Sequence, residues 1–265
     1  MRRSLLVLAA LACAGPVMAQ SAGPGTATSY PFQVGERFQY QVKLGIFSVG
    51  RASMHVAGLD TIGGHESFRL RFILNGKALF FSLDDTLTSW TGTRDFRSHR
   101  FLQLNNEDGR KRVRDYTIHA DSGFYRRANR PDTTYQTVAE PLDDVAFFYW
   151  VRTVPLTVGQ SYTWDRYFRP DRNPVRIRVL RRQNCELPGN IKRQCLLIQP
   201  SIRATGMLGE SSDARILITD DADRIPVEVR SSFSFGTLVL KLRSVTHGAP
   251  PTDLPPSADS GTGAQ

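Results

Sequence analysis

Paired carboxylates are the residues of this sequence with the clearest potential for chemistry, because general acid–base catalysis often uses two of them. Asp84-Asp85 and Asp143-Asp144 are adjacent pairs, and a third acidic group spans Asp220–Asp223. Adjacent residues on a strand point to opposite faces, so Asp84 and Asp85 would not converge on one substrate atom. The third group lacks the spacing and the distal Glu of an EF-hand calcium loop, and a hairpin turn is the favoured interpretation.

Other catalytic residue types do not form a recognisable motif. The five histidines are scattered singly, without a His or Cys at metal-ligand spacing. The sequence contains no G-x-S-x-G, H-E-x-x-H, P-loop or G-x-G-x-x-G motif. We therefore expect no metal, no cofactor and a non-enzymatic protein. An enzyme is the alternative, and the residues to inspect for it are Asp84, Asp143, Asp144, Tyr149 and Arg152.

Basic residues are abundant, and the 265-residue chain has a formal net charge of +9. Arg112, Arg114, Arg176 and Arg178 belong to arginine-rich segments that would form a positive surface. Because arginine donates paired hydrogen bonds to phosphate and carboxylate, these four residues are candidates to bind an anionic headgroup. The alternative is that arginines alternating with Val and Ile form the solvated face of a sheet.

The first residues have the pattern of a secretory signal peptide. Arg2-Arg3 precedes an apolar run from Leu5 to Ala14, and Val17-Met18-Ala19 resembles a small-residue cleavage site. Residues 1–19 are therefore predicted to be removed after Ala19, which indicates a periplasmic protein and makes nucleic acid an unexpected partner. Acylation of Cys13, as in a lipoprotein, is the less favoured alternative because the residues before it only partly resemble a lipobox.

The rest of the chain divides into one domain and two flexible ends. Residues 20–30 form a lead-in rich in Ser, Gly, Thr and Ala, residues 246–265 are rich in Pro and Gly, and both are expected to be disordered. Residues 31–245 are predicted to form a single β-rich domain. Export favours a disulfide between Cys185 and Cys195, which flank a predicted turn.

An alternation of apolar and polar residues recurs along this domain and predicts strands with one apolar face. The clearest example runs from Phe38 to Ile46, followed by a turn near Ser48–Gly50 and a strand containing Ala52, Met54 and Val56. Further strands are expected at residues 68–74, 116–120, 175–179, 195–198, 215–219, 227–235 and 237–242. The predicted fold is mainly all-β, a single curved antiparallel sheet or unclosed β-barrel with one short buried helix.

The segment that departs from the alternation is Asp143–Arg152. It begins with two acids, ends with a base and is followed by Pro155, the order that a helix favours. Because it is apolar nearly all round, the predicted helix should be buried against the concave side of the sheet. A buried strand is the alternative interpretation.

Three segments together resemble the exported bacterial family called domain of unknown function 3108 (DUF3108). They are Phe32–Tyr40 with the later Val49-Gly50, Asp143–Gly159, and Asp220–Gly236. The resemblance covers about residues 31–245 and implies an envelope protein of unknown activity. The segment from Ile216 to Gly236 is also similar to the last hairpin of periplasmic lipoprotein carriers, whose fold is an unclosed β-barrel around an apolar hollow.

These features lead to one functional hypothesis and one main alternative. The concave face is predicted to bind a lipid, another amphiphile or an apolar segment of a lipoprotein or envelope protein, with peripheral contact to a membrane. The residues expected to line it are Phe38, Tyr40, Val42, Leu44, Phe68, Leu70, Phe72, Phe147, Phe148 and Trp150, with the four arginines at the rim. The alternative is an envelope scaffold or assembly factor with a packed core, which acts through its surface.

Overall fold

The computed structural model describes residues 30–78, 81–203, 208–209, 213–234 and 236–248. The predicted signal peptide, Cys13, nearly all of the predicted lead-in and most of the predicted C-terminal tail lie outside these residues. The strands are β1 (Arg37–Leu44), β2 (Phe47–Ile62), β3 (His65–Ala78), β4 (Phe81–Gly92), β5 (Ser98–Glu107), β6 (Arg110–His119), β7 (Phe124–Arg127), β8 (Arg130–Gln136), β9 (Ser161–Trp164), β10 (Val175–Leu187), β11 (Ile191–Ser201), β12 (Arg215–Thr219), β13 (Pro226–Phe233) and β14 (Gly236–Thr246). An α-helix, α1 (Asp144–Trp150), and two 3₁₀ turns at Ala120–Ser122 and Pro170–Arg172 complete the described elements.

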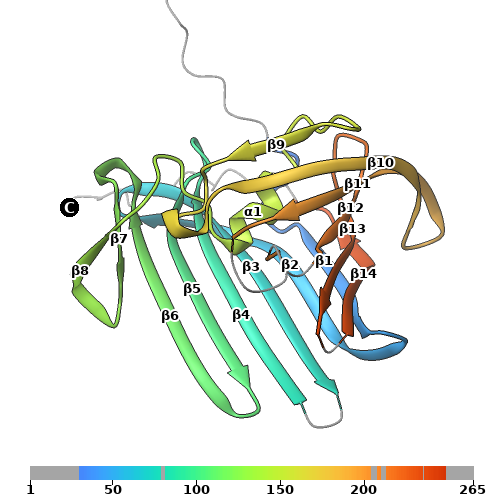
Figure 1. Ribbon diagram of the computed structural model, residues 1–265, viewed down its shortest axis with the longest axis horizontal. Helices are drawn as coiled ribbons and strands as arrows, with labels where there is room; N and C mark the ends of the chain where they lie inside the picture. The colour runs from blue at the N-terminus through green and yellow to red at the C-terminus, as the bar shows by residue number, and fades with distance from the viewer. Residues whose placement is uncertain (1–29, 79–80, 204–207, 210–212, 235, 249–265) are drawn as a thin grey trace, which may run out of the picture.

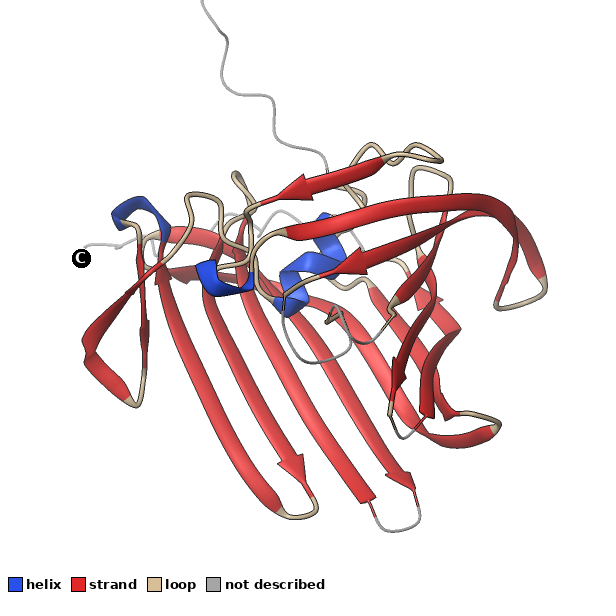
Figure 2. Ribbon diagram, viewed as in Figure 1, coloured by secondary structure: helices blue, strands red, loops and turns tan. Residues whose placement is uncertain are grey.

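All fourteen strands belong to one antiparallel sheet that curls around α1 (Figure 1). Its order is β8-β7-β6-β5-β4-β3-β2-β1-β14-β13-β12-β11-β10-β9. The edge strands β8 and β9 are not paired with each other in the described part of the chain, so the sheet remains unclosed. Figure 2 shows the helix on the inner side of the curved strands. The predicted mainly all-β, unclosed architecture with one short buried helix is confirmed.

The alternation seen in the sequence is the reason that one face of the sheet is apolar. In β1, Phe38, Tyr40 and Val42 are buried, whereas Arg37 and Gln39 between and beside them are exposed. In β10, the buried residues alternate with exposed arginines that include Arg176 and Arg178. Successive side chains of a strand point to opposite faces, so each such strand contributes apolar groups only to the concave side.

The first hairpin turns earlier than the sequence pattern predicts. β1 ends at Leu44 and β2 begins at Phe47, so Ser48–Gly50 lie within β2 rather than near the turn. Gly45 has a φ of 59°, a left-handed conformation that glycine adopts readily and that reverses the chain within two residues. Ile46 therefore lies in the turn, where it is 86% exposed, and not on the buried face of the strand.

Helix α1 begins at the acidic pair Asp143-Asp144. Asp143 is the N-cap, and its Oδ1 accepts hydrogen bonds from the backbone N–H groups of Val145 (2.9 Å) and Ala146 (3.0 Å). Ser89 of β4 donates to the other carboxylate oxygen at 2.6 Å. These contacts satisfy donors at the helix start and fix it to the sheet. The predicted helix is confirmed, with Asp143 as its cap.

Aromatic side chains hold α1 between two parts of the curled sheet. Phe148 stacks on Phe72 of β3 with ring centroids 6.1 Å apart. Trp150 meets Trp164 of β9 edge-on at 4.7 Å. Because β3 and β9 are far apart in the strand order, the helix bridges regions of the sheet that do not pair with each other.

A buried ion pair anchors the chain just beyond the other end of the helix. The guanidinium of Arg152 donates to both carboxylate oxygens of Glu36, at 2.6 and 2.9 Å. Its Nη2 also donates to the carbonyl oxygens of Pro31 (2.6 Å) and Asp223 (2.9 Å). Arg152 thus joins the segment before β1, the end of the helix and the β12–β13 turn, where the sequence predicted a hairpin turn.

The predicted disulfide between Cys185 and Cys195 is present, with the two Cα atoms 5.9 Å apart. It links β10 to β11 across a hairpin whose turn includes Gly189, as the sequence indicates. Such a bond restricts the unfolded chain and stabilises the hairpin.

Replacing Asp143 should change how stability depends on pH. Burial, which outweighs the hydrogen bonds that favour the ionised form, raises the pKa of Asp143 to about 6. The native carboxyl group therefore binds its proton more tightly than in the unfolded chain, and the free energy of unfolding falls as pH rises from about 4 to 6. In Asp143→Asn, which retains the capping oxygen, this fall should be smaller by about 2 to 3 kcal/mol. Urea denaturation of both proteins across this range measures the difference, and parallel stability curves would contradict the expectation.

Removing one member of the buried ion pair should cost more than removing both. In Arg152→Met, Glu36 loses its charged partner in a buried site, and we expect the free energy of unfolding to fall by about 3 to 5 kcal/mol. The double variant Glu36→Leu, Arg152→Met leaves no buried charge and should be more stable than Arg152→Met. Chemical denaturation measures both values, and a double variant that is less stable than the single one would argue against this account.

Candidate functional site

A cavity of about 590 Å³ lies on the concave side of the sheet, beyond the N-terminal end of α1. Its walls come from β1 to β6, β13, β14 and α1 and from three residues after β11. The lining residues are Val42, Leu44, Val49, Phe72, Leu74, Gly76, Lys77, Leu83, Asp85, Leu87, Gln103, Asn105, Glu107, Arg112, Arg114, Asp144, Val145, Phe148, Ile202, Leu208, Gly209, Phe233 and Leu238. The helix fills the neighbouring part of the concave space, and the cavity is the part that it leaves empty.

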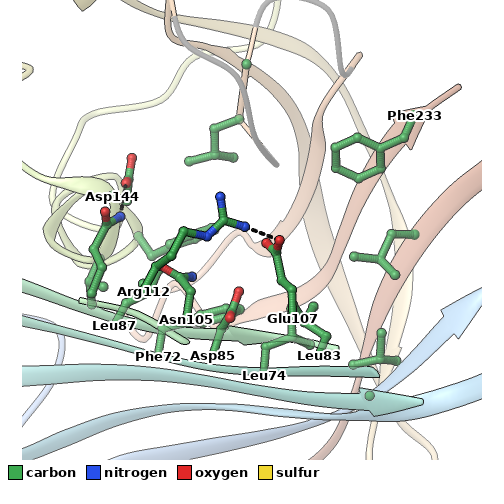
Figure 3. Close-up of a pocket in the computed structure, with 18 of the residues that line it drawn as sticks. Phe72, Leu74, Leu83, Asp85, Leu87, Asn105, Glu107, Arg112, Asp144 and Phe233 are labelled. Carbon is green, nitrogen blue, oxygen red and sulfur yellow. Dashed lines mark hydrogen bonds and ion pairs between the residues drawn. The ribbon is translucent and has the colours of Figure 1, made fainter. Parts of the chain in front are cut away.

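One wall of the cavity is apolar because of strand periodicity. Val42 and Leu44 from β1 continue the buried face that begins at Phe38. Phe72 and Leu74 do the same on β3, and Leu238 faces them from β14. Figure 3 shows Phe233 across the cavity from the strand that carries Phe72 and Leu74. This wall offers the kind of surface that binds hydrocarbon.

Polar groups line the part of the cavity formed by β4, β5 and β6, which continues the same face of the sheet from β3, since Asp85 is the register partner of Leu74. Asp85 of β4 stands opposite Asn105 of β5 in the strand register, and both line the cavity. The Oδ1 atoms of Asp85 and Asn105 are buried without a hydrogen-bond partner among the described residues. Burial raises the pKa of Asp85. Each of these strands thus presents polar groups at the cavity although its inward positions elsewhere are buried.

The charged side chains of the polar wall are only partly paired. Arg112 of β6 forms an ion pair with Glu107 of β5, and Figure 3 shows the two side chains meeting across the cavity. Asp144 accepts hydrogen bonds from Tyr167 at 3.0 Å and from Gln103 at 3.4 Å. Arg114 lines the same wall, and no ion pair of its guanidinium occurs within the described ranges. Arg114 is the register neighbour of Gln103, so its guanidinium belongs to the polar part of the cavity, which acidic side chains also line.

The structure brings together some of the residues that the sequence analysis selected. Four of the ten apolar candidates line the cavity: Val42, Leu44, Phe72 and Phe148. Arg112 and Arg114 line the polar part of the same cavity. The periodicity thus identified the concave face of β1 and β3, and Arg112 and Arg114 reach the cavity from β6.

The other candidates lie outside the cavity. Phe38, Tyr40, Leu70, Phe147 and Trp150 are buried in the protein core. Phe68 is partly buried in an aromatic cluster, with its ring centroid 5.4 Å from that of Phe32. Arg176 and Arg178 are exposed on β10, where the alternative reading of the sequence, a solvated face of the sheet, describes their position.

Several cavity residues were not found by sequence reasoning. Leu83 and Leu87 lie on β4, and Gln103, Asn105 and Glu107 lie on β5. Their inward positions mix apolar and polar side chains, so no period of two in hydrophobicity marks these strands. The usable signal was positional, since residues at i, i+2 and i+4 of any strand share a face.

The carboxylate pairs do not converge on one point. Asp84 is exposed on β4 and accepts a hydrogen bond from Asn75, whereas Asp85 faces the cavity. Asp143 caps the helix, and Asp144 is held by Tyr167. The two remaining residues selected for an enzyme, Tyr149 and Arg152, are buried at the far end of α1. These groups therefore lie apart, and the hydroxyl of Tyr149 is buried without a hydrogen-bond partner among the described residues.

A second hollow, of about 710 Å³, lies near the Glu36–Arg152 ion pair. It is larger but wider open, and acidic and basic groups such as Asp223 and Arg224 make up much of its lining. Tyr30 and Gly248, at which the described part of the chain begins and ends, also line it. The first cavity is therefore the better candidate for a ligand site, because apolar side chains and a few polar groups line it together.

Two other features are absent from the described residues. No group of three or more His, Cys, Asp or Glu side chains there is arranged to hold a metal ion. None of the helices in the described ranges is long and apolar enough to cross a membrane.

Comparisons with known proteins agree with this architecture. The sequence matches, over residues 39–243, the family model described as "Protein of unknown function (DUF3108)". A crystal structure of a beta-barrel-like protein of domain of unknown function DUF1849 from Brucella abortus has a TM-score of 0.52 and 12% identity, covering 82% of this chain and 99% of that one. The hypothetical protein CT021 from Chlamydia trachomatis covers 86% of this chain and 98% of its own at 10% identity, but its TM-score of 0.25 supports no argument. A search of curated proteins finds no match.

Proposed function

The chain belongs to the DUF3108 family of proteins of unknown function, and from this premise we propose that it is a non-enzymatic binder of amphiphiles. An apolar chain would occupy the space between Phe72, Leu74 and Leu238, and a polar or anionic head would lie near Arg112 and Arg114. The observation that carries the proposal is a cavity of about 590 Å³ that has apolar side chains from β1, β3 and β14 and, beside them, polar and charged side chains from β4, β5 and β6. Ligand sites in proteins typically have volumes of about 300 to 1,000 Å³.

The apolar and the polar part of the cavity suit different parts of a ligand. Burying a hydrocarbon chain against apolar side chains is favourable by roughly 25 cal/mol per Å². A charged head cannot enter such a surface without a partner, and a guanidinium supplies charge-assisted hydrogen bonds. A ligand with a hydrocarbon chain and a charged head matches both parts of the cavity. A purely apolar or purely polar ligand would leave one part without a matching group.

The proposal places the protein in the periplasm. Two features support this location: the signal-peptide pattern of residues 1–19 and the Cys185–Cys195 disulfide. Disulfides persist in oxidising compartments, and the periplasm is one of them. Lipids, lipoproteins and other envelope components are the amphiphiles and partners that such a protein would meet.

The alternative function is that of an envelope scaffold with a fully packed interior. Protein interiors are close-packed and contain few voids larger than a water molecule. The cavity between Leu74, Leu238 and Arg114 is far larger than such a void, which favours binding of a ligand over the scaffold.

Filling the cavity should weaken binding of an amphiphile. The double variant Leu83→Trp, Leu238→Trp adds two indole groups to the cavity wall. We expect it to bind a fluorescent long-chain fatty acid at least about tenfold more weakly than the wild type, because the space for the chain is reduced. Fluorescence titration of delipidated protein measures this change.

A matched control distinguishes filling from general damage. Thr86→Trp with Val239→Trp places the same groups on the same two strands, three residues after Leu83 and one residue after Leu238, at positions that point to the opposite face of the sheet. This control should bind the fatty acid as the wild type does. Equal affinity of all three proteins would count against the cavity as the binding site.

The arginines of β6 should select for an anionic head. Arg112→Gln with Arg114→Gln should weaken binding of a long-chain fatty acid about tenfold, the effect expected for the loss of charge-assisted hydrogen bonds, and should leave binding of its methyl ester nearly unchanged. Arg176→Gln with Arg178→Gln is the control, because these residues lie outside the cavity. Competition titrations with acid and ester measure the selectivity. Equal losses in both arginine pairs would disagree with this assignment of the headgroup site.

A further inference from the structure

The turn between β1 and β2 exposes two large apolar side chains that are neighbours in the chain. Ile46 is 86% exposed and Phe47 is 69% exposed. Single exposed apolar residues are common on protein surfaces and need no explanation. Ile46 and Phe47 are adjacent at the tip of a hairpin and are more exposed than the other large hydrophobic residues of the described chain. Such an exposed apolar patch indicates an interaction surface.

The fold does not require apolar residues at this turn. Gly45 supplies the left-handed conformation that the reversal needs. Turn positions of two-residue hairpins are usually taken by Gly, Asn or Asp. Neither Ile46 nor Phe47 belongs to the hydrophobic core. Their side chains are therefore explained by contact with something outside the chain rather than by folding.

This tip is continuous with the cavity. Phe47 stands opposite Leu44 in the strand register, and Leu44 lines the cavity. Cross-strand partners project from the same face of a hairpin, so Phe47 extends the apolar wall from Leu44 toward the tip. Val49, further along β2, also lines the cavity. An unbroken apolar path thus leads from the exposed tip into the proposed binding site.

The same end of the sheet presents basic groups. Antiparallel order places the β1–β2 and β5–β6 turns at one end, as Figure 1 also shows. Arg110 and Lys111 begin β6 directly after that second turn, and both are exposed. The acidic residues beside them are engaged, because Glu107 pairs with Arg112 and the Asp108 carboxylate accepts from the backbone N–H of Ser82 at 2.6 Å.

We infer that this end of the sheet docks on an anionic lipid bilayer, with Ile46 and Phe47 entering the interface and Arg110 and Lys111 contacting headgroups. Apolar side chains beside Lys and Arg are the combination that binds such interfaces. The inference rests on the proposed function, because docking through this tip would bring the cavity to the source of its amphiphile. A bilayer suits the tip because Ile46 protrudes, and a protruding group enters a fluid interface without a preformed pocket.

Flotation of the full-length protein with lipid vesicles tests the inference. The wild type should bind vesicles of phosphatidylcholine mixed with phosphatidylglycerol more strongly than vesicles of phosphatidylcholine alone. Ile46→Ser with Phe47→Ser should reduce binding to the mixed vesicles about tenfold or more, because the apolar groups that enter the interface are lost. Arg110→Gln with Lys111→Gln should reduce it by about fivefold for each charge removed, and only on the anionic vesicles.

The control for the apolar pair is Leu59→Ser. Leu59 is an exposed apolar residue of the same strand, twelve positions from Phe47 and so about 40 Å away along β2. This variant should bind vesicles as the wild type does. A wild type that does not bind the anionic vesicles, or an Ile46, Phe47 variant that binds as well as the Leu59 control, would overturn the inference.

A second measurement separates this inference from the proposed function. In solution without vesicles, the Ile46→Ser, Phe47→Ser variant should bind the fluorescent fatty acid within about twofold of the wild type, because the two residues do not line the cavity. Loss of vesicle binding with retained fatty-acid binding supports both conclusions. A wild type that binds vesicles through Ile46 and Phe47 but binds no fatty acid would refute the proposed function and leave the docking surface standing.

Discussion

The concave face of a single fourteen-stranded sheet must be kept from water, and the rest of the molecule follows from how this is done. Such a face is too large for one helix to cover. Helix α1 has seven residues and is therefore only about 10 Å long. Asp143 and Arg152 fix its two ends, so it covers one part of the concave space and cannot slide into the other. The cavity is the part of the concave face that the helix is too short to cover.

The two parts of the concave space are made from different residues. Around the helix, aromatic side chains such as Phe147 and Trp150 pack in a dense core with Phe38. Toward the open end, β1 and β3 supply Leu44 and Leu74, and the neighbouring β4 and β5 supply Asp85 and Asn105. An interior built only for stability would continue the apolar core or end it with solvated loops. Apolar residues beside polar ones match the hydrocarbon chain and the polar head of the amphiphile that we propose as ligand.

The sequence predicted those parts of the fold in which local pattern and tertiary role agree. The alternation of Phe38, Tyr40 and Val42 predicts a strand because its buried face is wholly apolar. The strands β4 and β5 carry no such pattern, since their inward positions include buried polar residues such as Ser89 and Ser98, which serve the helix cap. Periodicity cannot detect a strand whose inner face is polar, and it cannot tell that β3 and β9 both touch α1.

The same limit explains why the candidate site was only partly predicted. The apolar residues of one strand face were selected together, but whether each packs against the helix or faces the cavity depends on its position along the strand. Tyr40 and Leu44 differ in this way although they share a face of β1. The distinction is set by the length of α1 and by the two residues that anchor its ends. These are Glu36, which precedes β1, and Ser89 of β4, so both are distant from α1 in the sequence. Each strand is thus divided along its length: residues beside the helix belong to the packed core, and residues toward the turns line the cavity in which we propose that a ligand binds.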